Sequence, residues 1–143
     1  KYKELKILFF RVFNPDPCIC RKDDDYYIAV SSFEWFPGIP VYHSRDMKNW
    51  ELYTHVLTDD ETVDLKKLPS SKGIWAPCLT WCESENLFYV VYGVMNSMNA
   101  GYFEVDNYLI TASDIKGLGA SLFICIRQDL MRQSCTMMTT ENI

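Results

Sequence analysis

Short runs of β-branched and aromatic residues, bounded by polar residues, dominate the pattern of this chain. Such runs occupy residues 25–30 (DYYIAV), 87–92 (LFYVVY), 39–43 and 107–111. Runs of this length and composition are typical of β-strands. Turn-forming clusters separate them at residues 21–24, 36–38 and 68–73. No convincing helical stripe is found between Phe13 and Gly117, so the pattern predicts an all-β protein.

The strand pattern repeats along the chain. Residues 17–19 (PCI) recur as residues 77–79 (PCL), and an aromatic strand follows each copy. Residues 44–48 have a weaker echo in residues 112–116. A unit of several short strands that recurs after roughly 60 residues suggests the blades of a β-propeller, of which this chain holds about two. The alternative is two unrelated hairpins that share common strand residues.

Charge and hydropathy exclude several partners. The chain has 19 acidic and 14 basic residues, for a formal net charge of −5, and no basic cluster, which argues against a nucleic-acid partner. Charged residues interrupt every apolar run before the roughly 20 residues that span a bilayer, so we expect no membrane partner. Residues 1–12 superficially resemble a signal peptide, but the apolar run is short and no small-residue cleavage site follows. We therefore expect a cytoplasmic protein.

The cysteines give little indication of a metal site or a disulfide framework. Six cysteines in 143 residues are too few for a disulfide-dense scaffold. Their spacings flank no pair of histidines of the kind that binds zinc. Reduced, buried thiols are the favoured interpretation, and a structural zinc site is the less favoured alternative. We expect no metal centre.

Asp16 is the sharpest candidate for chemistry. It lies between Pro15 and Pro17, just before a predicted strand. Two prolines restrict the backbone on both sides, so this carboxylate is a candidate for a rigidly positioned general base. An ordinary Asp-Pro turn is the competing interpretation, and spacing alone does not overturn it.

Two aromatic segments are candidates for a saccharide pocket. They are residues 33–36 (FEWF), after the first aromatic strand, and residues 73–77 (GIWAP), before the second unit. Flat aromatic side chains suit the apolar faces of sugar rings. Packing between blades is an equally good interpretation for each segment taken alone.

Together these strings resemble a known family. FNPDPCIC, DDDYYIAVSSFEWFPGIPVYHSRDMKNW, GIWAPCL and NYLITASDIKG, in this order within residues 13–117, closely resemble glycoside hydrolase family 43. They are most similar to its branch of β-xylosidases and α-L-arabinofuranosidases. The resemblance implies a five-bladed propeller, an inverting mechanism, no redox cofactor, and a xylo-oligosaccharide or arabinose-substituted substrate. It also implies that Asp16 is the general base, and that Phe33, Trp75 and Ala76 line the pocket.

The ends of the chain depart from the family pattern. An orienting Asp and an acid Glu are also implied by the resemblance, and the strings that would carry them are not found in residues 118–143, which show no clear strand or helix pattern. Codons chosen for residues 117–122 give Thr-Trp-Ser-Glu-Pro in a shifted frame, which is the family's usual continuation. Codons chosen for residues 6–13 likewise give Asn-Pro-Ile-Leu-Pro-Gly-Phe in a shifted frame, which is the family's usual lead-in to NPDP. Our hypothesis is that both ends are out-of-frame translations around a genuine core at 13–117. Codons in the underlying DNA that do not allow the shifted readings would rule it out.

The resemblance therefore implies a glycosidase, but we expect this 143-residue chain to have little or no activity. The alternative is a non-catalytic carbohydrate-binding or non-functional propeller fragment.

Overall fold

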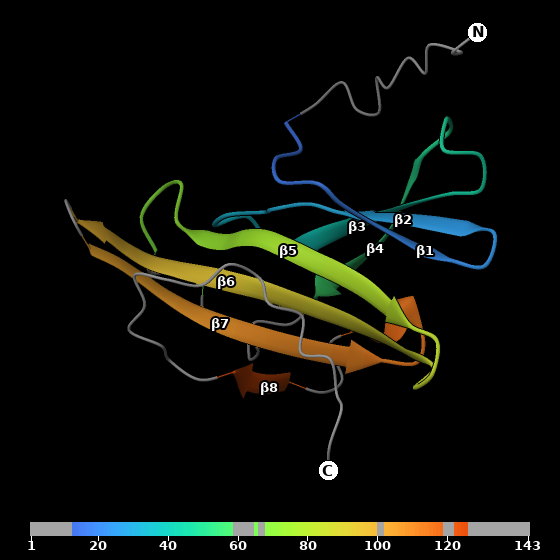
Figure 1. The fold of residues 1–143 in the computed structure, drawn as a ribbon. Helices are drawn as coiled ribbons and strands as arrows, with labels where there is room; N and C mark the ends of the chain where they lie inside the picture. The colour runs from blue at the N-terminus through green and yellow to red at the C-terminus, as the bar shows by residue number, and fades with distance from the viewer. Residues whose placement is uncertain (1–12, 59–64, 66–67, 100–101, 119–121, 126–143) are drawn as a thin grey trace, which may run out of the picture.

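The described residues of the protein form two antiparallel four-stranded sheets (Figure 1). A computed structural model describes residues 13–58, 65, 68–99, 102–118 and 122–125. The strands follow the sequence order within each sheet, as in a meander. The first sheet contains β1 (Cys18–Lys22), β2 (Asp25–Ala29), β3 (Gly38–Ser44) and β4 (Glu51–Leu57). The second contains β5 (Gly73–Cys82), β6 (Leu87–Asn99), β7 (Tyr102–Ala112) and β8 (Leu122–Cys125), with a short 3₁₀ helix, η1 (Ile115–Gly117), before β8.

The predicted strands and turns are confirmed. All four predicted runs overlap strands β2, β3, β6 and β7. The first hairpin pairs Lys22 with Asp25 and leaves two residues in its turn, where Asp23 has a φ of 53°. Positive φ matches the twist of a two-residue hairpin, and Asp tolerates it better than most residues do. Within the described ranges, no helix is long and apolar enough to cross a bilayer.

The internal repeat of the sequence corresponds to a repeat in the structure. Ile19 of β1 pairs with Ile28 of β2, and the corresponding pair in the second sheet is Leu79 with Val90. The weaker repeat, between residues 44–48 and 112–116, also has matching hydrogen bonds. Asp46 accepts a hydrogen bond from the backbone N–H of Lys48 at 2.8 Å, and Asp114 accepts one from the backbone N–H two residues further on at 2.7 Å. The two sheets are therefore two copies of one supersecondary unit.

The main core lies between the two sheets. The largest buried side chains on the second sheet are Tyr92 and Phe88, and the ring of Phe88 meets that of Tyr27 edge-on at 5.6 Å. The repeat shows which faces meet. Leu79 is 2% exposed because its face packs against the first sheet, whereas its equivalent Ile19 is 52% exposed on the far face of that sheet. Successive units thus pack face to face, as propeller blades do.

The first strands of the two sheets lie side by side (Figure 1). Cys18 of β1 is joined to β5, since its sulfur accepts a hydrogen bond from the backbone N–H of Leu79 at 3.3 Å. This contact brings the segment before β1 close to the middle of β5, and it positions the residues described in the next section.

One expectation about the chain's end is wrong. The sequence shows no strand pattern beyond residue 117, yet β8 pairs with β7 from Asn107↔Cys125 to Ile110↔Leu122. An edge strand needs only backbone hydrogen bonds to one neighbour, so its own hydrophobic pattern can be weak. The proposed division into a core at 13–117 and out-of-frame ends stays a prediction, because residues 1–12, 119–121 and 126–143 lie outside the described residues.

Candidate active site

Asp16 projects from the segment that leads into β1. Its side chain is exposed, and its φ is 51°. The preceding residue is anchored, because the backbone carbonyl of Pro15 accepts a hydrogen bond from the backbone N–H of Ser31 at 3.0 Å. The two prolines and this hydrogen bond together restrict the backbone that carries the carboxylate.

Ser31 connects Asp16 to β5. Its hydroxyl donates a hydrogen bond to Oδ2 of Asp16 at 2.7 Å and accepts one from the backbone N–H of Ala76, also at 2.7 Å. Ser31 is only 5% exposed. Among the described residues, Oδ1 of Asp16 has no hydrogen-bond partner. One carboxylate oxygen is therefore fixed by the protein, and the other is open to a water molecule.

Phe33 and Trp75 lie together beside this network. Phe33 forms a two-way backbone bridge with Ile74, with both N···O distances at 3.0 Å. The ring of Phe33 meets the ring of Trp75 edge-on, with centroids 6.1 Å apart. The indole N–H of Trp75 donates to the backbone carbonyl of Ser71 at 3.2 Å, which fixes the orientation of that ring.

Unusual backbone conformations gather at this place. Asp16, Phe33 and Ala76 have φ values of 51°, 51° and 44°. Left-handed conformations are costly for residues with a side chain, and for Phe and Ala more so than for Asp. Gly73, directly before the bridging residue Ile74, has a φ of 95°, and a Cβ there would lie 2.3 Å from the carbonyl oxygen of Phe33. Strain of this kind is often concentrated at functional sites, where it aims particular groups.

A pocket of about 310 Å³ adjoins this site, on the face of the first sheet that is turned away from the second sheet. Phe33 lies between the two: it lines the pocket, whereas Asp16, Trp75 and Ala76 do not. Phe13 stacks on Phe33 at 5.9 Å and forms another part of the wall. The remaining lining side chains combine aromatic and polar groups, namely Asn14, Val30, Ser31, Ser32, Trp35, Phe36, Pro37, Pro40, Tyr42, Leu52 and His55.

Comparison with known proteins decides the family. The family model for glycosyl hydrolases family 43 matches residues 7–120. The chain belongs to glycosyl hydrolase family 43. The matched range contains the core that the resemblance had indicated, and the recognition of the family from sequence is confirmed.

The relatives of this family 43 chain are much longer than the chain itself. A β-xylosidase of Bacillus subtilis is 46% identical over 105 residues, which is 73% of this chain and 19% of the relative. A non-reducing-end α-L-arabinofuranosidase of Bacteroides ovatus is 42% identical over 98 residues, or 66% of this chain and 18% of the relative. The chain thus spans about a fifth of the length of the curated relatives it matches.

Solved structures of family 43 show the architecture to which the two sheets belong. A xylan β-1,4-xylosidase from Bacillus halodurans superposes with a TM-score of 0.70 at 45% identity, over 73% of this chain and 20% of that one. An exo-β-1,3-galactanase from Clostridium thermocellum, 19% identical, superposes with a TM-score of 0.59 and shares the fold. These neighbours are five-bladed β-propellers, so the two sheets are two blades of an incomplete propeller, as predicted.

The family 43 blades bring all four predicted site residues together. Asp16 and Ala76 share the Ser31 hydroxyl, and Phe33 contacts Trp75. Their roles as base and pocket wall stay predictions. Ser31 itself was not predicted. A pair of serines directly after an aromatic strand is the only sequence feature that could have indicated it.

The site offers no assembled metal ligands. In the part of the chain that the structure describes, no three His, Cys, Asp or Glu side chains gather closely enough to hold a metal ion. What the described residues offer is a single fixed carboxylate beside an aromatic wall.

Proposed function

We propose that these two blades carry the general-base half of the active site of an inverting glycoside hydrolase. The observation that carries the proposal is the hydrogen-bonded line from Asp16 through Ser31 to Ala76, beside the rings of Phe33 and Trp75. In an inverting hydrolase, a carboxylate base activates a water molecule that attacks the sugar opposite the leaving group. Asp16, with Oδ2 anchored and Oδ1 open, has the geometry to take the proton from that water.

The proposed substrates are xylan-derived oligosaccharides. The relatives named above include a β-xylosidase and an α-L-arabinofuranosidase, which supports terminal xylosyl or arabinofuranosyl residues as the sugar that is released. The rings of Phe33 and Trp75 provide an apolar wall against which a pentose ring can pack.

We further propose that the 143-residue chain alone turns over little or no glycoside. Inverting hydrolysis also needs a protonated carboxyl group on the other side of the glycosidic bond. The strings that carry the orienting Asp and the acid Glu in the family are not found in this sequence. Loss of a positioned proton donor costs on the order of 10²–10⁴ in rate. Aryl-xyloside turnover at the rate of an intact relative, abolished by Asp16→Asn, would contradict this proposal.

The role of Asp16 can be tested separately in an intact enzyme. Residues 13–117 replace the matching stretch of the Bacillus subtilis β-xylosidase, and hydrolysis of aryl-xyloside is measured. We expect an active chimera whose kcat falls about 10²- to 10⁴-fold on Asp16→Asn. Asp24→Asn, an exposed carboxylate in the first hairpin turn, is the matched control and should leave kcat unchanged. Equal effects of the two substitutions would reject Asp16 as the base.

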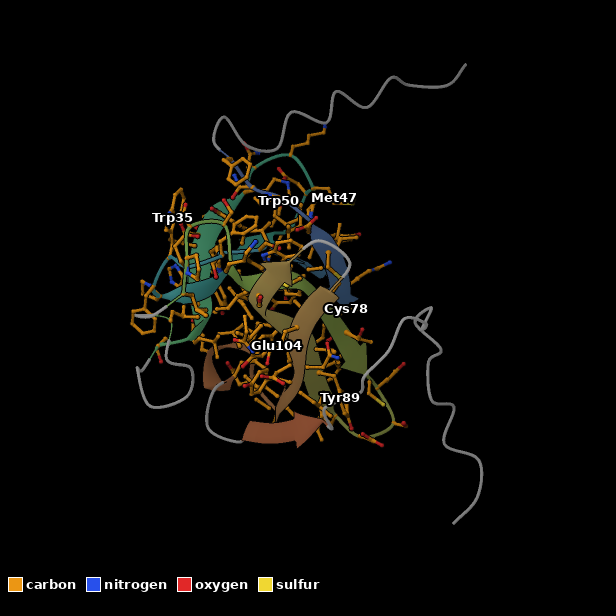
Figure 2. The ribbon with its side chains drawn as sticks, turned by 90° about the vertical axis from the view of Figure 1, so that its left-hand side faces the viewer. Trp35, Met47, Trp50, Cys78, Tyr89 and Glu104 are labelled. Atoms are coloured by element: carbon orange, nitrogen blue, oxygen red, sulfur yellow. The ribbon has the colours of Figure 1, made fainter. Side chains whose placement is uncertain are left out.

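A second candidate function is saccharide binding without hydrolysis. The 310 Å³ pocket favours it, because Trp35 is 65% exposed at its edge, where Figure 2 shows it projecting from the first sheet. Titration of xylobiose into the chain, followed by tryptophan fluorescence, tests this function. Saturable quenching that disappears in Trp35→Ala and persists in Trp81→Phe, a substitution within the core between the blades, would support it; no saturable change would exclude it.

A further inference from the structure

Two cysteines occupy equivalent positions on the adjacent inner strands of the two blades. Cys18 is the first residue of β1, and Cys78 lies at the matching position of the repeat in β5. The sulfur of Cys18 rests against the backbone of the residue after Cys78: the N–H of Leu79 donates to it at 3.3 Å, and the carbonyl of Leu79 lies 3.6 Å away. With standard backbone dimensions, the sulfur of Cys18 is within about 6 Å of the Cα of Cys78.

The Cys18 thiol lies in a half-buried environment beside Cys78. Burial raises the pKa of the Cys18 thiol above its usual value, the hydrogen bond with Leu79 opposes this rise, and the neighbouring Cys78 thiol adds to it. Cys20 and Cys82 are placed differently. Cys20 is buried between the blades, and the sulfur of Cys82 contacts the hydroxyl of Ser84 at 3.3 Å.

Exposure differs between the two partners in a way that suits a two-step reaction. Cys78 is exposed, whereas Cys18 is half-buried. Figure 2 shows Cys78 on β5, on the side of the molecule along which β1 runs. A small oxidised disulfide from solution can therefore reach Cys78 first, while Cys18 waits beside it as the resolving thiol.

We propose that Cys18 and Cys78 are a modification site at which a small-molecule disulfide forms a reversible bond between the two blades. The thiolate of Cys78 attacks the small disulfide and releases one small thiol, which leaves a mixed disulfide on Cys78. The thiolate of Cys18 then attacks the sulfur of Cys78 and releases the second small thiol. The two cysteines lose two protons and two electrons in total, and the small disulfide is reduced to two thiols.

The bond would act on the candidate active site without touching it. Cys18 is two residues after Asp16, and Cys78 is two residues after Ala76, so the disulfide spans the gap that the Ser31 hydroxyl spans. It would also close a long loop of chain, which removes conformational freedom from the unfolded state. The oxidised chain should therefore resist urea better than the reduced chain. This inference does not depend on glycosidase activity.

The experiment titrates the chain with mixtures of oxidised and reduced glutathione. Cys125 and Cys135 are replaced by Ser throughout, which confines the reaction to Cys18, Cys20, Cys78 and Cys82. We expect the loss of two thiols, a mass lower by two hydrogens, and a non-reduced tryptic pair in which residues 12–21 are joined to residues 73–116. Fragment ions of this pair should place the link at Cys18 and Cys78 rather than at Cys20 or Cys82. The urea midpoint should rise with the same redox dependence, and excess reduced glutathione should reverse both changes.

Single substitutions separate the steps. Cys82→Ser, the matched control on β5, should oxidise as the parent does. Cys18→Ser should stop at a glutathione adduct on Cys78, and Cys78→Ser should lose the linked peptide. In the parent chain, a stable glutathione adduct on Cys78, a Cys78–Cys82 link, or a link between two chains in place of the Cys18–Cys78 peptide would overturn the proposal.

Discussion

Ser31 donates a hydrogen bond of 2.7 Å to Oδ2 of Asp16, 15 residues earlier in the chain. The same hydroxyl accepts a hydrogen bond from the backbone N–H of Ala76, 45 residues later. One buried hydroxyl thus sets the position of the candidate base relative to β5, and it is the centre of the candidate active site.

The first prediction concerns this hydroxyl. Ser31→Ala should release Asp16 and leave the backbone N–H of Ala76 without its acceptor. Since each such hydrogen bond contributes about 0.5–1.5 kcal/mol, the two losses should together lower the free energy of unfolding by about 1–3 kcal/mol. In the chimeric β-xylosidase, kcat should fall about 100-fold, because misplacement of a reacting group by 1 Å has effects of that size, while KM changes little. Urea unfolding and steady-state kinetics measure the two effects.

Ser44→Ala is the matched control for Ser31→Ala. Ser44 is similarly buried, at 3% exposure, and does not line the pocket. Its hydroxyl donates a hydrogen bond to Oδ1 of Asp46 at 3.0 Å and accepts one from the backbone N–H of Met47 at 2.9 Å. This substitution should lower stability by a similar amount and leave kcat of the chimera near the parent value. If both substitutions lower kcat equally, Ser31 has a structural role only.

The second prediction concerns the backbone bridge beside the site. Gly73→Ala places a Cβ 2.3 Å from the carbonyl oxygen of Phe33, at a φ of 95° that residues with a side chain rarely adopt. The bridge between Phe33 and Ile74 should break, with a loss of at least about 1–3 kcal/mol in the free energy of unfolding. Gly117→Ala is the control, since its Cβ would make an ordinary contact at 3.8 Å with Ala112. Equal urea midpoints for the two variants would contradict this prediction.

Whether a feature can be predicted from the sequence depends on how far apart in the chain its interacting residues are. The strands of the two blades could be predicted because each run carries its own aromatic and β-branched pattern, and Asp16, Phe33, Trp75 and Ala76 because they lie in distinctive strings. Ser31 could not, because its role comes from hydrogen bonds to residues far away in the chain. The left-handed backbone of Phe33 and Ala76 was equally hidden, because neither residue type prefers it.

The third prediction concerns acid stability at the opposite end of the first sheet. Hydrogen bonds to Asp25 from His43 at 2.7 Å and from Arg45 at 3.0 Å lower the pKa of this carboxyl below 3.8, the contribution of His43 being the larger. A lowered folded-state pKa stabilises the fold fully above pH 3.8, and this contribution is lost as the pH falls through the folded-state value. Asp25→Asn should therefore lower stability at pH 7 and flatten the decrease below about pH 4.

Urea unfolding at a series of pH values from 7 to about 2 tests the role of Asp25. The control is Asp24→Asn, the exposed neighbour in the hairpin turn, which should leave the acid decrease as it is in the parent. If the free energy of unfolding falls equally steeply with pH in Asp25→Asn and in the parent, other carboxylates cause the loss of stability in acid.

The last prediction concerns the contact between the blades. The ammonium group of Lys22, at the end of β1, lies 3.9 Å from the centre of the Trp81 ring on β5 and 5.2 Å from that of Phe88 on β6. A cation over an aromatic face contributes about 0.5–1 kcal/mol at a partly exposed site. Lys22→Gln should lower the free energy of unfolding by that amount. Lys48→Gln, which changes an exposed lysine in the turn after β3, should leave it unchanged.

A double-mutant cycle tests the contact itself. Lys22→Gln combined with Trp81→Leu should cost less than the sum of the two single changes, because each removes the same contact. Strict additivity in this double-mutant cycle would show that Lys22 and Trp81 contribute independently and that no cation–π contact couples them.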